Sequence, residues 1–530
     1  MPWPPPVTMA VFPFSPRNFS SSHTSRTALL KTIYLRTIHL QAIYRRSGGT
    51  TGKMAQRYVR SVGAYLPLLR LDRKAASGAF GWSGLAMPRS GRRSVAAWDE
   101  DALTMAVEAG RTALAGHHAD SVVFASTSAP FRERLQANLL CEALGLPRDV
   151  SVSDVAGSRR CGVSALRQAL LNGGGDALVA AGERRATMPG SAFQLTWGDG
   201  AAAALIGDDG CARLLGSACI NVDFVDVYVS DERPLPYASE ERFVREEAIA
   251  LAFVPAIEAA CANAGVSAAE IALAVVHEPV GGVYKGLAAV AGLKAPNLCD
   301  DITAAAGDLG AAHALFGLAL ALERGKPGDR ILVAGFGSGC DALVLEMTAP
   351  CDGSASAETS LREGAALTNI TRFLSLAGSL DLDWGPRSEL DQKTAASVLA
   401  RHGRDMHGFI GGRDARGNVQ FPKTLIPVSP LADGPEPLAD VRLADLEASI
   451  VSVTADRLNF TPDPPFHFGL VQFDNGARVS MEFRDIEGAT PQVGDRVRMR
   501  FRVKSIDRKR GFRTYFWKAA PLERPKLEEG

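Results

Sequence analysis

The sequence predicts an α/β protein whose layered first part is followed by a small antiparallel β-barrel. Up to about residue 350, short apolar runs alternate with Ala- and Leu-rich helical stretches. This alternation is typical of a sheet covered by helices on both faces. Two strand-plus-glycine endings, Trp197–Gly200 and Gly335–Gly339, indicate a duplicated half-domain. Beyond residue 440 the pattern changes to short alternating strands separated by Gly, Pro and Asp, which is typical of a barrel.

The expected strands of the first part are apolar runs flanked by Gly and Asp, and the expected helices lie between them. The strands are Ser121–Ser126, Ala177–Ala181, Ala201–Ile206, Ala272–Val276 and Arg330–Ala334. The helices are Asp101–Ala115, Leu135–Leu144, Gly162–Leu171, Ala248–Ala264 and Gly310–Glu323. The barrel strands are Ser449–Val453, Gly469–Phe473, Arg478–Phe483, Arg496–Val503 and Thr514–Lys518.

Composition favours a soluble protein of two or three domains. The chain has 530 residues and a formal net charge of zero, so no overall field favours nucleic acid or a membrane surface. No apolar run reaches the ~18 residues of a membrane helix. Eight scattered cysteines without a Cys-x-x-Cys pair favour buried thiols over a disulfide framework or a zinc site. We therefore expect a cytoplasmic location and no metal.

The first 53 residues differ from the rest. They carry seven Lys and Arg and no acid, and the first acidic residue of the chain is Asp72. A basic, Ser-rich, acid-free start is typical of an organellar transit peptide. The alternative is a disordered or non-native extension, with the first domain opening at Met54.

The segment SDVAGSRRCGVSALRQAL combines a strand end, a turn and a buried helix. A cysteine at such a helix start is activated as an acyl-transfer nucleophile. The segment resembles thiolases, ketoacyl synthases and hydroxymethylglutaryl-CoA (HMG-CoA) synthases, in which the nucleophilic cysteine precedes a small-residue helix. The resemblance places that cysteine at Arg159, which forms no thioester. Cys161 lies roughly 200° further around the helix and is expected to be a packing thiol. Arg159 is instead expected to bind a substrate carboxylate or a CoA phosphate, or to pair structurally.

Two further motifs resemble HMG-CoA synthases. The run ALAVVHEPVGGVYKGLAAVAGL resembles the strand that ends in a catalytic histidine before a proline, which places that histidine at His277. GDLGAAHALFGLALAL resembles the loop whose asparagine helps to hold an enolate oxygen, and here that position is Asp308. His277 is therefore the expected base or donor. For Asp308 two interpretations stay open: a base, or a mark of lost function.

The remaining landmarks are Thr127 and a glycine loop. The synthase motif Ser-Glu-Ser-x-Pro corresponds here to STSAP, so Thr127 replaces the acid/base glutamate. GFGSGCDALVL resembles the loop that closes the family's acyl site, so Gly337, Ser338 and Gly339 are expected to line the substrate. The resemblance covers about residues 54–350 and implies a thiolase-like, duplicated α-β-α-β-α domain.

The C-terminal part resembles the zinc-ribbon and OB-fold module that accompanies acyl-CoA thiolases. The expected segments are a linker at 351–407, a degenerate ribbon at 408–435 and an OB-fold at 436–525. Near Asp414–Gly417 and Ile426–Pro430 the four cysteines of the ribbon are absent, so no zinc is expected. Arg496, Arg498, Arg500, Arg502 and Lys504 share one face of a predicted strand. That face is interpreted as solvated, as a contact for CoA phosphates or an acidic partner, or, least favoured, as a nucleic-acid groove.

Four functions follow from the resemblance. The first is aldol or retro-aldol chemistry on an acyl-CoA without an acyl-cysteine, using His277 and Asp308. The second is an inactive subunit that assembles with an active thiolase. HMG-CoA synthase acyl transfer and nucleic-acid binding are less favoured. The expected substrate is a CoA thioester with no permanently bound cofactor, and the expected assembly is a homodimer, with a separate thiolase as the possible second partner.

Overall fold

The computed structural model describes residues 56–351, 355–384, 395–432, 434–487 and 490–527. The expectations for residues 1–53 lie outside these ranges.

A nine-stranded mixed sheet frames the first part of the chain and divides into two halves. One half has the spatial order β5-β4-β6-β7-β1, and the other has the order β8-β13-β12-β11. The halves meet where β1 and β8 pair over only two positions, Tyr58 with Arg213 and Val59 with Ala212. The strands are β1 (Tyr58–Tyr65), β4 (Ser121–Ala125), β5 (Ser151–Val155), β6 (Ala177–Glu183), β7 (Gly200–Gly207), β8 (Ala212–Asn221), β11 (Leu273–Val276), β12 (Arg330–Phe336) and β13 (Gly339–Met347).

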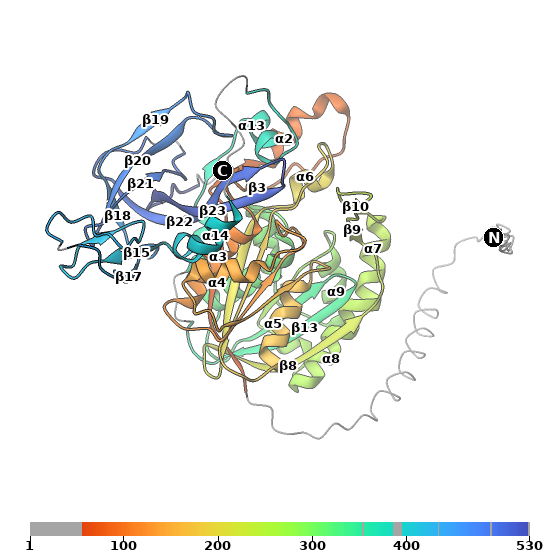
Figure 1. Cartoon of the computed structure of the whole chain (residues 1–530). Helices are drawn as coiled ribbons and strands as arrows, with labels where there is room; N and C mark the ends of the chain where they lie inside the picture. The colour runs from red at the N-terminus through yellow and green to blue at the C-terminus, as the bar shows by residue number, and fades with distance from the viewer. Residues whose placement is uncertain (1–55, 352–354, 385–394, 433, 488–489, 528–530) are drawn as a thin grey trace, which may run out of the picture. The chain divides into compact units, whose positions relative to one another are not determined.

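Four helices complete five layers (Figure 1). α3 (Ala102–Leu114) covers β1, β6 and β7, and α8 (Val254–Ala264) covers β8 and β13. α5 (Cys161–Leu171) and α11 (His313–Arg324) contact strands of both halves and lie between them. This order confirms the predicted duplicated α-β-α-β-α fold. Outer helices also include α4 (Gln136–Leu144), α7 (Glu241–Ala248) and α9 (Val283–Ala291), and α10 (Cys299–Ala305) precedes α11.

Small residues allow the central layers to approach closely. β7 reads GAAAALIG and is buried along its whole length, with α3 and α11 packed against it. A Cβ added at Gly63 of β1 would lie 2.1 Å from the carbonyl oxygen of Ala109 in α3. Glycine at this position therefore sets the spacing between α3 and the sheet.

Among the residues that the structure describes, one helical stretch, Glu241–Ala264, is long and apolar enough to cross a membrane by length and composition alone. It consists of α7, η2 (Ile249–Phe253) and α8. The apolar side chains of α8 pack against β8 and β13 in a buried cluster. Packing inside the domain accounts for this composition.

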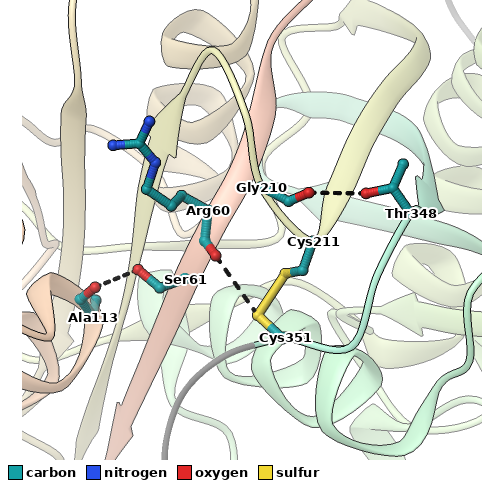
Figure 2. Close-up of a disulfide and its surroundings, with 7 residues drawn as sticks. All are labelled: Arg60, Ser61, Ala113, Gly210, Cys211, Thr348 and Cys351. Atoms are coloured by element: carbon teal, nitrogen blue, oxygen red, sulfur yellow. Dashed lines mark hydrogen bonds between the residues drawn. A yellow bond between two sulfur atoms is a disulfide. The ribbon is translucent and has the colours of Figure 1, made fainter.

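A disulfide joins Cys211 to Cys351, as Figure 2 shows. The expectation of free thiols throughout is wrong for this pair. The reason is long-range: β8 and β13 pair antiparallel, with Ala212 opposite Met347, and this brings the two cysteines together across 140 residues of sequence. Closing so long a loop removes chain entropy from the unfolded state worth about 5 kcal/mol.

The predicted linker at 351–407 carries regular structure of its own. It contains α12 (Ser356–Arg362), β14 (Ala365–Ala366), α13 (Ile370–Leu376) and α14 (Ala396–His407). β14 pairs with β2 (Leu69–Asp72), which also pairs with β3 (Arg92–Val95). The segment is therefore fastened to the first domain through a three-stranded sheet.

The C-terminal part forms two sheets. The smaller sheet contains β15 (Ile410–Arg413), β16 (Val419–Gln420) and β17 (Ala439–Arg442). β15 and β16 lie within the predicted degenerate ribbon, whereas β17 lies within the predicted OB-fold segment. In the first turn of the smaller sheet the Asp414 carboxylate accepts N–H bonds from Arg416 and Asn418, so the turn closes through a carboxylate. The six-stranded sheet contains β18 (Ala448–Ile450), β19 (Thr454–Asp456), β20 (Phe466–Phe473), β21 (Arg478–Glu482), β22 (Arg496–Asp507) and β23 (Phe512–Pro521).

The row of bases on β22 pairs with acids of two origins. Glu100 and Glu108 belong to the first domain, and the others belong to the C-terminal part: Glu447, Asp474, Glu482 and Asp485. Arg500 pairs with Glu108 of α3, and Arg502 lies 3.2 Å from Glu100. The carboxylate of Asp485, in the barrel itself, also contacts Arg502. All of these acids belong to the same chain. The interpretation as a solvated face is wrong for Arg500 and Arg502, whose side chains are largely buried in ion pairs, and contact with CoA phosphates or an acidic partner stays a prediction.

Candidate active site

Arg159 lies in the turn between β5 and α5, with its side chain only 8% exposed. Its Nη2 forms an ion pair with Asp226, and its Nη1 lies 3.3 Å from Oδ2 of Asp308. The guanidinium charge is thus balanced by two carboxylates. At the position that the resemblance gives to the nucleophile, the chain has a buried cation locked into an ion-pair network.

Asp308 joins this network to His277. His277 follows β11, and its Nε2 lies 2.8 Å from Oδ1 of Asp308, while the backbone N–H of Gly310 donates to the same oxygen at 2.7 Å. Burial alone would raise the pKa of Asp308, but the charges of Arg185, His277 and Arg159 hold it well below its usual range. Asp308 is therefore ionised, and Nε2 of His277 donates its proton to it.

His313, the first residue of α11, stacks on His277 with ring centroids 4.7 Å apart. Its Nδ1 accepts the N–H of Leu309 at 3.1 Å. Burial, together with the charge of His277, lowers the pKa of His313 to about 3, so the ring is neutral. His277, Asp308 and His313 offer ligand atoms within 4.8 Å of one another. Two guanidinium groups already contact Asp308, however, and a divalent cation there would meet both positive charges.

The glycine loop lies beside the Arg159 turn. A Cβ at Gly337 would lie 2.8 Å from Oγ of Ser158 and 3.3 Å from the backbone nitrogen of Arg159. Gly339 has φ +113, and a Cβ there would meet the Ile220 carbonyl oxygen at 2.1 Å. The positive φ and the lack of room both require glycine. Ser338, between them, also has a positive φ of 49.

Thr127 joins the site through Glu183. The backbone N–H and the hydroxyl of Thr127 both donate to Oε1 of Glu183 at 2.8 Å. Ser128 and the N–H of Ala311 donate to the same carboxylate. Glu183 is fully buried at the end of β6. Thr127 is thus held by an acid from the neighbouring strand.

Cys161 is buried in the central core between the two halves of the sheet. Burial raises the pKa of its thiol. A buried thiol with a raised pKa is a poor nucleophile, which agrees with the expected packing role.

The structure adds Asp226, Arg185, Glu183 and His313 to the residues that the sequence singled out. Arg185 and Glu183 follow the predicted strand 177–181, and polar residues at strand ends are a usable signal. His313 stands alone in an apolar helix, which gives no such signal. Asp226 lies in a segment without periodicity and is recognised only through its contact with Arg159.

A cavity of about 520 Å³ lies elsewhere, where the first domain meets the barrel. Its lining includes Trp98, Asp99, Arg372 and His467. None of the site residues predicted from the sequence lines it.

Comparison with known proteins agrees with this architecture. An HMG-CoA synthase from Aeropyrum pernix is 32% identical over 305 residues, covering 54% of this chain and 83% of that protein. The corresponding protein of Thermococcus onnurineus is 29% identical over 290 residues, covering 52% and 82%. The structure of PksG, an HMG-CoA synthase from Bacillus subtilis, matches with a TM-score of 0.51 at 18% identity, covering 62% of this chain and 92% of that chain. The family model of the ChsH2 C-terminal OB-fold domain matches residues 440–502.

The layered fold and the order of the strands define a thiolase-like protein with a C-terminal OB-fold, as predicted. The chain belongs to the HMG-CoA synthase family.

Proposed function

We propose that this chain binds a CoA thioester without forming an acyl-enzyme and acts as a non-condensing subunit beside an active thiolase-type enzyme. The observation that carries the proposal is the guanidinium of Arg159, at the expected nucleophile position, paired with Asp226 and Asp308. A guanidinium forms no thioester. The second expected donor is also occupied, because Nε2 of His277 donates to Asp308.

The assembly in this proposal is a homodimer that contacts a separate thiolase. β5 forms one edge of the nine-stranded sheet, and Ser151, Ser153 and Asp154 on it are exposed. An exposed edge strand is a template for pairing with a second copy. A location in the cytoplasm belongs to the same proposal. It is supported by six free cysteines among the described residues, of which five are buried, whereas the Cys211–Cys351 disulfide is a bond that a reducing cytosol disfavours.

Incubation of the full chain with acetyl-CoA is expected to leave its intact mass unchanged. An active thiolase incubated in parallel gains one acetyl group because its cysteine is acylated. A stable acetyl adduct on Cys161 would contradict the proposal.

Co-expression with a thiolase followed by size-exclusion chromatography is expected to give a joint complex, and a strictly separate homodimer would argue against the subunit role.

Cysteine-free aldol or retro-aldol chemistry is the second candidate. It is favoured by the 2.8 Å contact of His277 with Asp308, since a carboxylate that orients a histidine is a common general-base arrangement. If the chain cleaves or forms a carbon–carbon bond on an acyl-CoA, His277→Ala is expected to reduce turnover by about 100-fold or more. Product formation is measured by chromatography, and an unchanged rate in His277→Ala would remove this candidate.

A further inference from the structure

The cavity of about 520 Å³ lies where three parts of the chain meet. Trp98 and Asp99 come from the first domain, Arg372 comes from α13, and Arg484 follows β21 of the barrel. Its volume is within the range of about 300–1,000 Å³ that is typical of small-molecule sites. Among the described residues that line the cavity, none belongs to the Arg159 site. A ligand bound here is therefore separate from the CoA thioester of the proposed function.

Arg484 lies in the wall of this cavity with part of its hydrogen-bonding capacity unused. The residue is 8% exposed, its Cζ lies 5.1 Å from the Trp98 ring centroid, and its Nε lies 3.1 Å from Oδ2 of Asp99. Its Nη2 is buried and has no hydrogen-bond partner within the part of the chain that the structure describes. The Glu482 carboxylate lies 3.7 Å from Nη2, which is beyond hydrogen-bond distance.

The two residues that Arg484 contacts also carry an unpartnered polar atom. Nε1 of Trp98 is a buried donor and Oδ1 of Asp99 is a buried acceptor, and neither has a partner among the described residues. The other oxygen of Asp99 accepts from Lys518 at 2.9 Å. Burial alone would raise the pKa of Asp99, but the charges of Lys518 and Arg484 hold it below its usual range, so the carboxylate is ionised. Unused donors and an unused acceptor therefore lie side by side in the wall.

We propose that this cavity binds a free α-amino acid with an apolar side chain, held by Trp98, Asp99 and Arg484. The carboxylate of the ligand accepts from Nη2 of Arg484 and Nε1 of Trp98, and its ammonium group donates to Oδ1 of Asp99. An α-amino acid carries both charged groups on one carbon, which matches donors and an acceptor that lie side by side. Buried polar atoms without partners are unfavourable, so a ligand that pairs all three is stabilised.

The rest of the lining favours an apolar side chain on that ligand. The apolar lining includes Leu68, Leu69, Leu382, Trp384, Pro464 and Ile486. Arg372, which also lines the cavity, does not compete for the ligand carboxylate because it is paired with Asp463 and Glu487. A carboxylic acid without an amino group would leave Asp99 Oδ1 unpaired, and an amine without a carboxylate would leave Arg484 Nη2 unpaired.

The test uses L-phenylalanine and two derivatives that each lack one charge. Phenylalaninamide lacks the carboxylate, and N-acetyl-L-phenylalanine lacks the ammonium group. Each is titrated into the full chain by isothermal titration calorimetry, with L-leucine as a second apolar amino acid. L-phenylalanine is expected to bind about 10- to 100-fold more tightly than either derivative, a difference typical of one charged hydrogen-bonded contact. Equal affinity for all three compounds would overturn the proposal, and so would the absence of binding by both amino acids.

Two variants assign the contacts to residues. Arg484→Met is expected to lower the affinity for L-phenylalanine to about that for phenylalaninamide, and to leave the affinity for phenylalaninamide unchanged. Trp98→Phe keeps an aromatic ring but removes the Nε1 donor, and is expected to weaken L-phenylalanine binding by about 3- to 10-fold. An affinity for L-phenylalanine that neither variant changes would contradict the proposed site.

Arg478→Met is the matched control. Arg478 begins β21, is exposed, donates to Gln472 and is not among the residues that line the cavity. This variant is expected to bind L-phenylalanine as the parent chain does. Where Arg484→Met does not fold, the comparison of the three compounds on the parent chain and on Trp98→Phe decides the outcome.

Discussion

Replacing Arg159 with methionine is expected to lower the free energy of unfolding by about 3–5 kcal/mol, because it leaves the buried Asp226 without its cation and Asp308 with one guanidinium fewer. Asp226 and Asp308 have side chains only 9% and 16% exposed, so water screens their repulsion poorly. Urea denaturation followed by circular dichroism measures the change. A decrease in the free energy of unfolding below about 1 kcal/mol would mean that the Arg159 ion pairs do not stabilise the fold.

A charge-compensated variant and pH provide the controls. Arg159→Met combined with Asp226→Asn and Asp308→Asn removes the uncompensated charges and is expected to recover much of the stability. The folded-state pKa of Asp308 lies below its unfolded value of about 3.9. The contribution of ionised Asp308 to the free energy of unfolding is therefore fully present above that value and is lost as the pH falls below it. The difference between the parent chain and Arg159→Met should therefore shrink as the pH falls below about 3.9.

Replacing Arg502 with methionine is expected to lower the free energy of unfolding by about 3 kcal/mol and to weaken the attachment of the barrel to the first domain. Arg502 is fully buried, and its Nη2 contacts Tyr65, Glu100 and Asp485 at 3.1–3.2 Å. Burial already raises the pKa of Glu100, and Arg502 opposes that shift. Without Arg502, Glu100 takes up a proton more readily, which limits the loss.

The same substitution at Arg496 is the matched control on the same strand. Arg496 pairs with Glu447 and Asp474, but its side chain is 39% exposed. Exposed ion pairs contribute little, so Arg496→Met is expected to cost at most about 1 kcal/mol. Both variants are compared by chemical denaturation. Equal losses at the two positions would show that burial between the domains does not set the contribution of Arg502.

Most of the fold could be predicted because its elements have local signatures. Four buried strands, β4, β6, β7 and β12, are apolar runs bounded by Gly or Asp and lie where the sequence placed them. The alternation of β22 also predicted that its bases share a face. Their partners could not be predicted, since Glu100 and Glu108 lie some 400 positions earlier and nothing local marks them. Similarly, no local pattern joins Cys211 to Cys351.

In the candidate site, too, the individual residues could be predicted from the sequence, whereas their contacts could not. The structure brings Arg159, His277 and Asp308 together, although family motifs had indicated them one at a time. Of the three interpretations of Arg159, the ion pairs with Asp226 and Asp308 agree with structural pairing, but nothing in the sequence marked Asp226 as the partner. Asp308 was open between a base and a mark of lost function, and its low pKa argues against the base. Tertiary contacts decide which arginine has unused N–H groups, and the sequence alone carries no such information.

The contact between the basic face of β22 and the acids of the first domain also bears on how this protein could be divided. If the chain were cut between the layered domain and the barrel, the first fragment would expose Glu100 and Glu108 and the second would expose Arg500 and Arg502. Opposite charges steer diffusing fragments together, and salt screens that attraction. The two fragments should therefore complement one another in trans, with an association rate that falls as ionic strength rises. We therefore expect that a gene for such a protein can be split in two and that its products still assemble.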